Sequence, residues 1–273
     1  MTALRQRILM CPPDFYEVSY VINPWMENNR GRTDKVLAHR QWQGLRDALA
    51  RHADIALVAP QAGQPDMVFT ANAGFVIGNQ VVVSQFFSEE RQGEAPFFQD
   101  WFARQGFEIL PWPEGMPFEG AGDALSDRGQ PLLWVGSGFR SATTAPSLLE
   151  ALFRRPVAHL HLVDPRFYHL DTCLCPLAGG YLLYYPAAFD EGSRKAIAKL
   201  VPPEKRIAVD DADALAFACN AVELENHVFL NAASEALQGK LRAAGFTPVI
   251  TPLSEFMKAG GAAKCLTLKL VES

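Results

Sequence analysis

Residues 75–86 read FVIGNQVVVSQF, two short apolar runs separated by a turn-forming Gly-Asn pair. Short apolar runs bounded by turn residues are typical of β-strands. Pro96 follows this stretch, and proline is favoured in the first turn of a helix. Phe98, Trp101 and Phe102 then share one helical face. The stretch therefore predicts strands followed directly by a helix.

The same combination recurs along the chain. Four more helical stretches have apolar residues three or four positions apart. Their apolar faces are Ala38-Trp42-Leu45-Leu49, Leu148-Leu149-Leu152-Phe153 after Pro146, Ala196-Ile197-Leu200 and Leu237-Leu241-Ala244. Other strand-like runs cover residues 7–10, 55–58, 132–135, 160–163, 181–185, 228–230 and 266–271. Five helices that alternate with strands fit either radial repetition about an axis or an open doubly wound sheet, and periodicity alone does not separate the two.

The composition narrows the classes of protein and partner. Hydrophobic residues make up 49% of the chain and no linker divides it, so residues 1–273 are predicted to form one α/β domain. A net charge of -5 and the absence of glycine-rich phosphate motifs disfavour nucleic acid and nucleotides, so a small-molecule substrate is expected. No signal-peptide core or bilayer-length apolar stretch is present, so a cytoplasmic location without a membrane partner is predicted. The odd number of cysteines, five, favours reduced thiols.

Cys265 follows a run of small residues, AGGAAK over 259–264, which allows a ligand to approach the backbone closely. A free cysteine is more often a small buried apolar residue than a nucleophile. A nucleophilic thiol needs a nearby base, commonly a histidine that a third group orients. His169 is the best candidate base, since on an extended segment it would share one face with Asp171. The H-x-D pattern alone is a weak signal.

Two further segments combine polar groups with turn residues. Residues 118–123, FEGAGD, place Glu119 and Asp123 in a glycine-rich turn. Carboxylates are costly to bury unless a cation meets them, and a guanidinium would do so. A turn with solvated acids is an equal alternative. Residues 65–74, PDMVFTANAG, are either part of a site or a plain entry into a strand.

Taken together, these segments resemble the guanidine-modifying (pentein) superfamily, which contains arginine deiminases, dimethylarginine hydrolases and amidinotransferases. The resemblance covers essentially the whole chain and is closest to the arginine dihydrolase branch. It rests on the motifs at residues 10–14, 20–26, 65–74, 118–123, 167–173 and 260–265, in that order. It implies an α/β propeller of five helix-and-strand units around a pseudo-fivefold axis, with the active site along that axis.

The resemblance also implies roles for single residues. Cys265 is expected to be the nucleophile and His169 the general acid and base, accompanied by Glu119. Asp171 and Asn72 would hold guanidinium nitrogens. The other substrate-binding residues implied are Phe69 on the guanidinium plane and, around the α-amino and α-carboxylate groups, Asn23, Asp66, Arg91 and Arg140. No metal and no cofactor is expected, because the substrate supplies its own electrophile.

Asn72 is the informative departure, because deiminases of the superfamily carry Asp there. A carboxylate and the urea oxygen of citrulline both only accept hydrogen bonds, so a carboxylate at this position would favour release of citrulline. An amide can turn its NH2 toward that oxygen and retain citrulline. Retained citrulline can be attacked again, which gives ornithine, carbon dioxide and two ammonia molecules. We therefore expect an arginine dihydrolase. The alternatives are an arginine deiminase, a dimethylarginine hydrolase, an amidinotransferase and a non-catalytic arginine-binding protein.

The remaining cysteines and histidines have structural interpretations. Cys173 and Cys175 lack the spacing of a zinc site and are predicted to be buried strand positions. The other residues predicted to serve packing or structure are Cys11, Cys219, His159 and His161. Dihydrolases often carry a second, C-terminal domain, and its activity is expected to be absent here. Formation of a homo-oligomer is left open.

Overall fold

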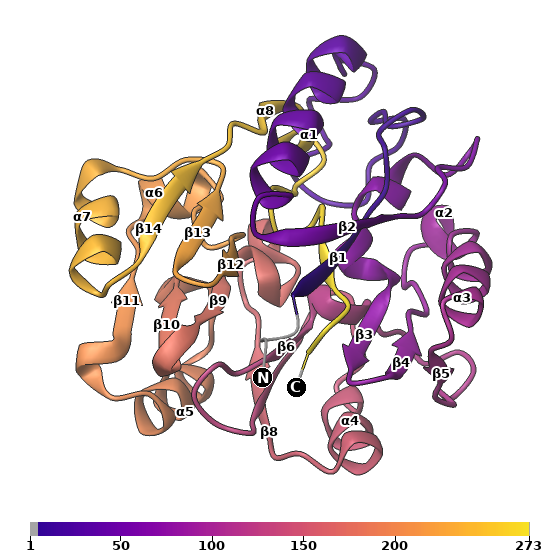
Figure 1. Ribbon diagram of the computed structural model, residues 1–273. Helices are drawn as coiled ribbons and strands as arrows, with labels where there is room; N and C mark the ends of the chain where they lie inside the picture. Colours follow the sequence, from indigo (N-terminus) through magenta and orange to yellow (C-terminus); the bar gives the residue numbers. More distant parts are fainter. Residues whose placement is uncertain (1–4, 273) are drawn as a thin grey trace.

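The computed structural model describes residues 5–272 and contains five three-stranded sheets arranged around a common centre (Figure 1). Four sheets are built in the same way: two consecutive strands pair antiparallel, and a third strand, reached through a helix, pairs parallel with the second. These sheets contain β3 (Gly74–Ile77), β4 (Gln80–Val83) and β5 (Glu108–Ile109); β6 (Ala124–Ser126), β7 (Leu133–Ser137) and β8 (Val157–His161); β9 (Leu174–Leu177), β10 (Tyr181–Tyr184) and β11 (Arg206–Ala208); and β12 (Val222–Leu224), β13 (His227–Leu230) and β14 (Thr247–Ile250).

The fifth sheet joins the two ends of the described chain. β15 (Leu268–Lys269) pairs antiparallel with β1 (Gln6–Met10), and β1 pairs parallel with β2 (Ala53–Leu57). The C-terminal strand thus completes the unit that the N-terminal strand begins. No sheet among residues 5–272 has more than three strands, which excludes the open doubly wound sheet and confirms the five-unit α/β fold.

The helix between the second and third strand of each unit was predicted, and all five are confirmed. They are α1 (Lys35–Leu49), α3 (Ala95–Arg104), α4 (Ala145–Phe153), α5 (Glu191–Leu200) and α7 (Glu235–Ala243). Side chains cap three of their first turns: Asp34 accepts from the Leu37 amide, Asp190 from that of Ser193 and Ser234 from that of Leu237. Three shorter helices were not predicted: α2 (Glu89–Gln92), α6 (Asp211–Leu215) and α8 (Ser254–Met257). None of the helices within residues 5–272 is long and apolar enough to cross a bilayer.

The sequence-based strand predictions were right for the middle strands and incomplete elsewhere. Most strands that flank a middle strand were missed because they are two to four residues long and are defined by their partners' hydrogen bonds. The predicted strand over 266–271 is shortened to Leu268–Lys269, since the Leu266 and Thr267 amides donate to Ala262 and Lys264 in a turn. The ends of the predicted domain, residues 1–4 and 273, lie outside the described residues.

A tight turn precedes the first strand of each unit. Three of these turns are 3-10 turns, Thr70–Ala73 before β3, Gly120–Gly122 before β6 and Leu170–Thr172 before β9, and they pack against one another. Backbone hydrogen bonds close similar turns at residues 217–220 before β12 and 264–267 before β15. Because the sheets are arranged radially, these five turns meet near the axis and bring distant segments together.

Trp134 tests the packing of a middle strand. The ring is fully buried in β7 and its indole N–H donates to Asp127 over 2.8 Å. Trp134→Ala is expected to lower the free energy of unfolding by about 3–5 kcal/mol because it leaves a large cavity. Trp134→Phe keeps a ring and loses the hydrogen bond, so about 1–2 kcal/mol is expected. Urea unfolding of both variants measures this, and equal losses would contradict the packing argument.

Candidate active site

A small enclosed pocket of about 10 Å³ lies where the turns meet. Eight of the predicted site residues line it: Asn23, Asp66, Phe69, Asn72, Arg91, Arg140, His169 and Cys265. The other two, Glu119 and Asp171, are fully buried directly behind His169 and Cys265. The structure therefore brings all ten predicted residues together, and the thiol and the imidazole share one cavity.

The Cys265 thiol is buried among polar partners. Its Sγ atom accepts a hydrogen bond from Asn220 Nδ2 over 3.1 Å and donates toward the Asp171 carboxylate over 3.5 Å. Burial, and next the negative charge of Asp171, raise the pKa of Cys265 well above its usual value, against the Asn220 hydrogen bond and the Lys264 ammonium. Without a cationic ligand the cysteine is therefore a thiol and not a thiolate at neutral pH.

Asn220 is a site residue that sequence reasoning missed. Its Nδ2 donates to the Asp171 carbonyl as well as to Cys265 Sγ, and its Oδ1 accepts from the Ala262 and Cys265 amides. One side chain thus holds the cysteine loop and the neighbouring turn in register. A signal existed in the sequence, because Asn220 stands two positions before β12, as Asn72 stands two positions before β3.

His169 and Glu119 form a buried, hydrogen-bonded imidazole–carboxylate pair. His169 Nε2 lies 2.6 Å from Glu119 Oε2, and Arg140 donates to the same carboxylate oxygen over 3.2 Å. Burial disfavours the carboxylate, but the charges of Arg140 and His169 prevail and hold the pKa of Glu119 below its usual value. Glu119 is therefore ionised and can fix the imidazole and stabilise its protonated form. Solvated acids in this turn, the structural alternative, are excluded.

Two local expectations about these segments need correction. Leu170–Thr172 is a 3-10 turn and not an extended segment, so Asp171 reaches Cys265 from that turn and not by strand alternation with His169. Asp123 is buried as well, but it accepts from the Ser141 hydroxyl and the Leu170 amide and lines no part of the pocket. Asp123 therefore supports the turns.

Asn72 is held in one orientation by two partners. Its Oδ1 accepts from Arg91 Nη1 over 2.9 Å and its Nδ2 donates to the Glu119 carbonyl over 3.1 Å. Because a guanidinium only donates and a carbonyl only accepts, the positions of the amide oxygen and nitrogen are determined. A Cβ at Gly122 would lie 2.3 Å from Asn72 Nδ2, so only glycine allows this approach. The second N–H of the amide remains for a ligand.

Charged groups face the opposite end of the pocket. Arg91 forms a bidentate pair with Glu94, at 2.8 and 2.9 Å, and also donates to the Asp66 carbonyl. Asp66 accepts from the Tyr20 hydroxyl through Oδ2, while its buried Oδ1 has no hydrogen-bond partner among the described residues. Burial raises the pKa of Asp66 although Arg91 opposes the shift. An acceptor of this kind is suited to a ligand ammonium.

Asn23 was expected to bind the α-amino or α-carboxylate group of the substrate, but its polar atoms bond to the protein backbone. Its side chain donates to the Ala259 carbonyl and accepts from the Trp25 and Met26 amides, so its polar atoms hold two loops at the pocket. Phe69 packs edge-on against Tyr16 and Phe256 and leaves no room for a Cβ at Gly261, where the nearest ring atom would lie at 2.7 Å.

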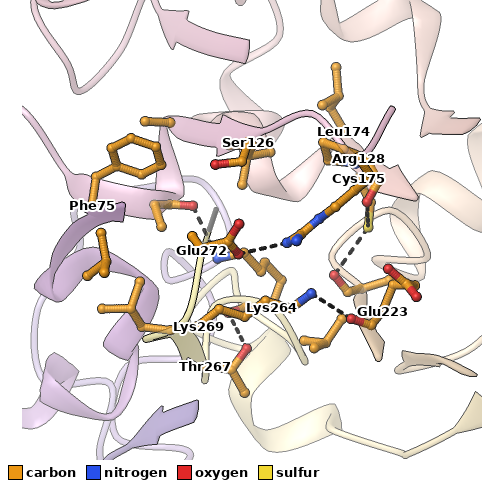
Figure 2. A pocket seen from close by; sticks show the side chains of 18 residues that line it. Phe75, Ser126, Arg128, Leu174, Cys175, Glu223, Lys264, Thr267, Lys269 and Glu272 are labelled. Carbon is orange, nitrogen blue, oxygen red and sulfur yellow. Dashed lines mark hydrogen bonds and ion pairs between the residues drawn. The ribbon is translucent and has the colours of Figure 1, made fainter. Parts of the chain in front are cut away.

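A second cavity, of about 40 Å³, is lined by Lys264 and Thr267 of the cysteine turn, whereas Cys265 and His169 are not among its lining residues (Figure 2). An ion pair of Arg128 and Glu272 at 2.7 Å lines it, and Lys269 donates to the Glu223 carbonyl over 2.6 Å. Lys264 also lines this cavity, and its charge lowers the pKa of Asp171 against the stronger effect of burial, which leaves that pKa raised, at about 6. The cavity is thus electrostatically linked to the thiol site although it is separate from it.

The other cysteines and histidines behave as predicted in part. All five cysteines are free and buried. Cys175 lies in β9, whereas Cys173 directly precedes that strand, so only one of the pair is a strand position. His159 and His161 alternate on β8 with exposed side chains. His159 contacts the Ser137 hydroxyl over 2.7 Å.

A ring of five ββαβ units with a cysteine and a histidine–carboxylate pair on its axis defines the guanidine-modifying α/β propellers. A comparison with family profiles matches residues 24–272 to the family described as N,N-dimethylarginine dimethylhydrolase, eukaryotic. The chain is 40% identical to the N(G),N(G)-dimethylarginine dimethylaminohydrolase of Mycobacterium tuberculosis, over 98% of this chain and 87% of that protein. The chain belongs to this family.

Higher identity connects it to a particular branch. The chain is 55% identical to the bifunctional arginine dihydrolase/ornithine cyclodeaminase AgrE of Nostoc sp., over 98% of its own length but only 38% of that protein. It matches the N-terminal domain of the cyanobacterial arginine dihydrolase ArgZ with a TM-score of 0.97 and 53% identity, over 98% of both chains. Structures of that domain contain substrate, product or a covalently bonded reaction intermediate.

The electrostatics of Cys265 can be tested by alkylation in the absence of substrate. Asp171→Asn removes the charge that raises the thiol pKa and is expected to speed iodoacetamide labelling of Cys265 at pH 8 roughly tenfold per unit of pKa lowered. Asn220→Ala removes a stabilising donor and is expected to slow it.

Mass spectrometry of the Cys265 peptide measures these rates. Glu94→Gln is the matched control, because that buried carboxyl contacts Arg91 and not the sulfur. An unchanged or slower rate in Asp171→Asn would show that the carboxylate does not suppress the thiolate.

Proposed function

We propose that this protein is an arginine dihydrolase, which hydrolyses L-arginine to L-ornithine, ammonia and carbon dioxide through a covalent intermediate on Cys265. The proposal depends on one observation: a buried thiol, an imidazole held by a carboxylate behind it, and the Asn72 amide line a single pocket. The similarity to AgrE and to the ArgZ domain supports it. We also propose that residues 1–273 act as one catalytic domain, since the match to the separate ArgZ domain covers nearly the whole chain.

Charge complementarity supports a cationic substrate. The carboxylates at the pocket, Asp66, Glu94, Glu119 and Asp171, outnumber the guanidinium groups of Arg91 and Arg140. Burial raises the pKa of Glu94 to about 7 and that of Asp171 to about 6, against the cations that each faces. The guanidinium and ammonium of arginine would supply the missing positive charge. Arg140 and Arg91 would face the substrate carboxylate, and Asp66 Oδ1 would accept from the ammonium.

In the first half-reaction the guanidinium would lie against Asp171 and Phe69, and its charge would lower the pKa of the Cys265 thiol. The thiolate attacks the guanidinium carbon, and His169 donates a proton to the terminal nitrogen, which leaves as ammonia. His169 then takes a proton from a water molecule, whose oxygen attacks the thiouronium carbon. The C–S bond breaks and citrulline forms, with the thiol regenerated. Glu119 stabilises the imidazolium that each cycle requires.

Asn72 would decide whether citrulline is released or retained. One of its amide hydrogens is used by the Glu119 carbonyl, and the other can donate to the urea oxygen of citrulline. The retained urea carbon is attacked again by Cys265, and His169 protonates the side-chain nitrogen, which leaves as ornithine. Water then displaces the carbamoyl group from sulfur, and the carbamic acid decomposes to carbon dioxide and the second ammonia. Atoms balance with two waters consumed per arginine.

Product analysis tests the proposal. Native protein incubated with arginine is expected to give ornithine, with citrulline present in no more than small amounts. Asn72→Asp is expected to release citrulline as the main product, because a carboxylate repels the urea oxygen and pairs with Arg91. Chromatography coupled to mass spectrometry quantifies both products, and Cys265→Ala serves as the inactive control. Citrulline as the sole product of the native protein would refute the dihydrolase assignment.

Hydrolysis of dimethylarginine is the second candidate, favoured by the family match and the mycobacterial relative. The higher identity to the two arginine dihydrolases, 55% and 53% against 40% for the mycobacterial relative, favours arginine over dimethylarginine. We expect kcat/KM for arginine to exceed that for N,N-dimethylarginine by at least about tenfold, the discrimination that one or two misplaced methyl groups bring. Steady-state ammonia and dimethylamine release measures the ratio. A ratio reversed in favour of dimethylarginine would make that reaction the function.

The cellular context stays a prediction. We propose a cytoplasmic location, while the formation of a homo-oligomer remains open. Absence of nucleic-acid, metal and cofactor involvement in the reaction likewise remains a prediction from the chemistry of the site.

A further inference from the structure

Two histidines and a glutamate meet at the boundary between two units, away from the substrate pocket. His52 directly precedes β2, His227 is the first residue of β13, and Glu225 lies in the hairpin between β12 and β13. One donor atom from each lies within 4.8 Å of the other two. His52 Nδ1 is 3.1 Å from Glu225 Oε2, and the two imidazole centroids are 4.3 Å apart. None of the three residues lines the catalytic pocket.

One nitrogen of this cluster lacks a hydrogen-bond partner. His227 Nδ1 is buried and has no hydrogen-bond partner among the described residues. Leaving a buried polar nitrogen without a partner costs about 1–3 kcal/mol. The Glu225 side chain is 67% exposed and can turn toward both imidazoles. The arrangement therefore contains a buried nitrogen that lacks a partner, beside a second imidazole and an exposed carboxylate.

The backbone at Glu225 is also unusual. Its φ of +59° lies in the left-handed region, where L side chains other than Asn and Asp are uncommon and where a tight hairpin ordinarily places glycine. Glutamate here costs conformational energy that a glycine would avoid. The strained position directs a carboxylate toward His52 instead.

We propose that His52, Glu225 and His227 bind a divalent transition metal, with Zn²⁺ as the preferred ion. Two imidazoles and one carboxylate form a common three-residue zinc donor set, with water as the fourth ligand. In a tetrahedral site with zinc–nitrogen distances of about 2.0–2.1 Å, the ligand atoms lie about 3.3 Å from one another. Side-chain rotations that move these atoms by roughly 1 Å would bring the three residues to this spacing. Imidazole and carboxylate ligands also bind Ni²⁺ and Cu²⁺ with high affinity. Zinc is favoured here because it accepts a tetrahedral arrangement of these ligands.

The ion would act as a clamp between units. His52 belongs to the sheet of β15, β1 and β2, and Glu225 and His227 belong to the sheet of β12, β13 and β14. The turns of the same two sheets carry Cys265 and Asn220, whose side chains are hydrogen bonded. Zinc at this boundary would strengthen the contact that holds the nucleophile in place without entering the reaction. The inference does not depend on which guanidino compound the protein hydrolyses.

Titration of the chelator-treated protein with ZnCl₂ tests the proposal. Isothermal calorimetry is expected to give one ion per chain with micromolar or tighter affinity, and saturating zinc is expected to raise Tm by roughly 5 °C. His227→Ala and His52→Ala should lose both effects. Glu225→Gln, at an exposed position that tolerates substitution, should weaken binding at least about tenfold while the protein remains folded.

Two controls separate this site from the active site. His161→Ala removes an exposed strand histidine outside the cluster and should bind zinc as the native protein does. Cys265→Ala removes the thiol, a competing zinc ligand, and should retain one ion per chain. Loss of binding in Cys265→Ala but not in His227→Ala would overturn the proposal, as would the absence of binding at micromolar zinc. Circular dichroism verifies that each variant is folded.

Discussion

The pairing of β15 with β1 is the constraint on which the rest of the structure depends. Ile8 and Leu9 stand opposite Lys269 and Leu268, so the last described strand completes the first sheet. This pairing closes the ring of five units and places the turn that precedes β15 at the axis. Cys265 lies in that turn, and Asn72, Asp171 and Asn220 lie in the corresponding turns of other units.

Equivalent positions of the repeated unit contribute different chemistry. Phe69, Glu119 and His169 each stand immediately before the 3-10 turn of their units. The repeat therefore places an aromatic ring and an imidazole at one cavity, and a carboxylate directly behind the imidazole. Asn72 and Asn220 occupy another shared position, two residues before a strand, and each amide connects its turn to a neighbouring one. The repeated backbone thus brings the equivalent turns close together, and the different side chains at these turns give the site its chemical groups.

The buried charges explain why the site needs its ligand. Glu119 is compensated by Arg140 and His169 and is ionised, whereas burial leaves Asp171, Glu94 and Asp66 with raised pKa values. Burial, and next the charge of Asp171, raise the pKa of the Cys265 thiol and hold it protonated. A bound guanidinium would reverse both effects, because it stabilises the carboxylates and the thiolate together. On the proposed function, activation of the thiol would therefore depend on binding of the guanidinium substrate.

The sequence by itself determined the five helices, their alternation with middle strands and the candidates Cys265, His169 and Glu119, since periodicity and residue type are local properties. Periodicity did not separate a ring from an open sheet; the family resemblance indicated the ring, and the tertiary structure confirmed it, because β15 pairs with a strand more than two hundred and fifty positions earlier. The tertiary structure alone decided the role of Asn220, the engagement of Asn23 with two loops and the turn geometry of Asp171. Those features are hydrogen bonds between residues distant in the chain, and no local pattern encodes which partners meet.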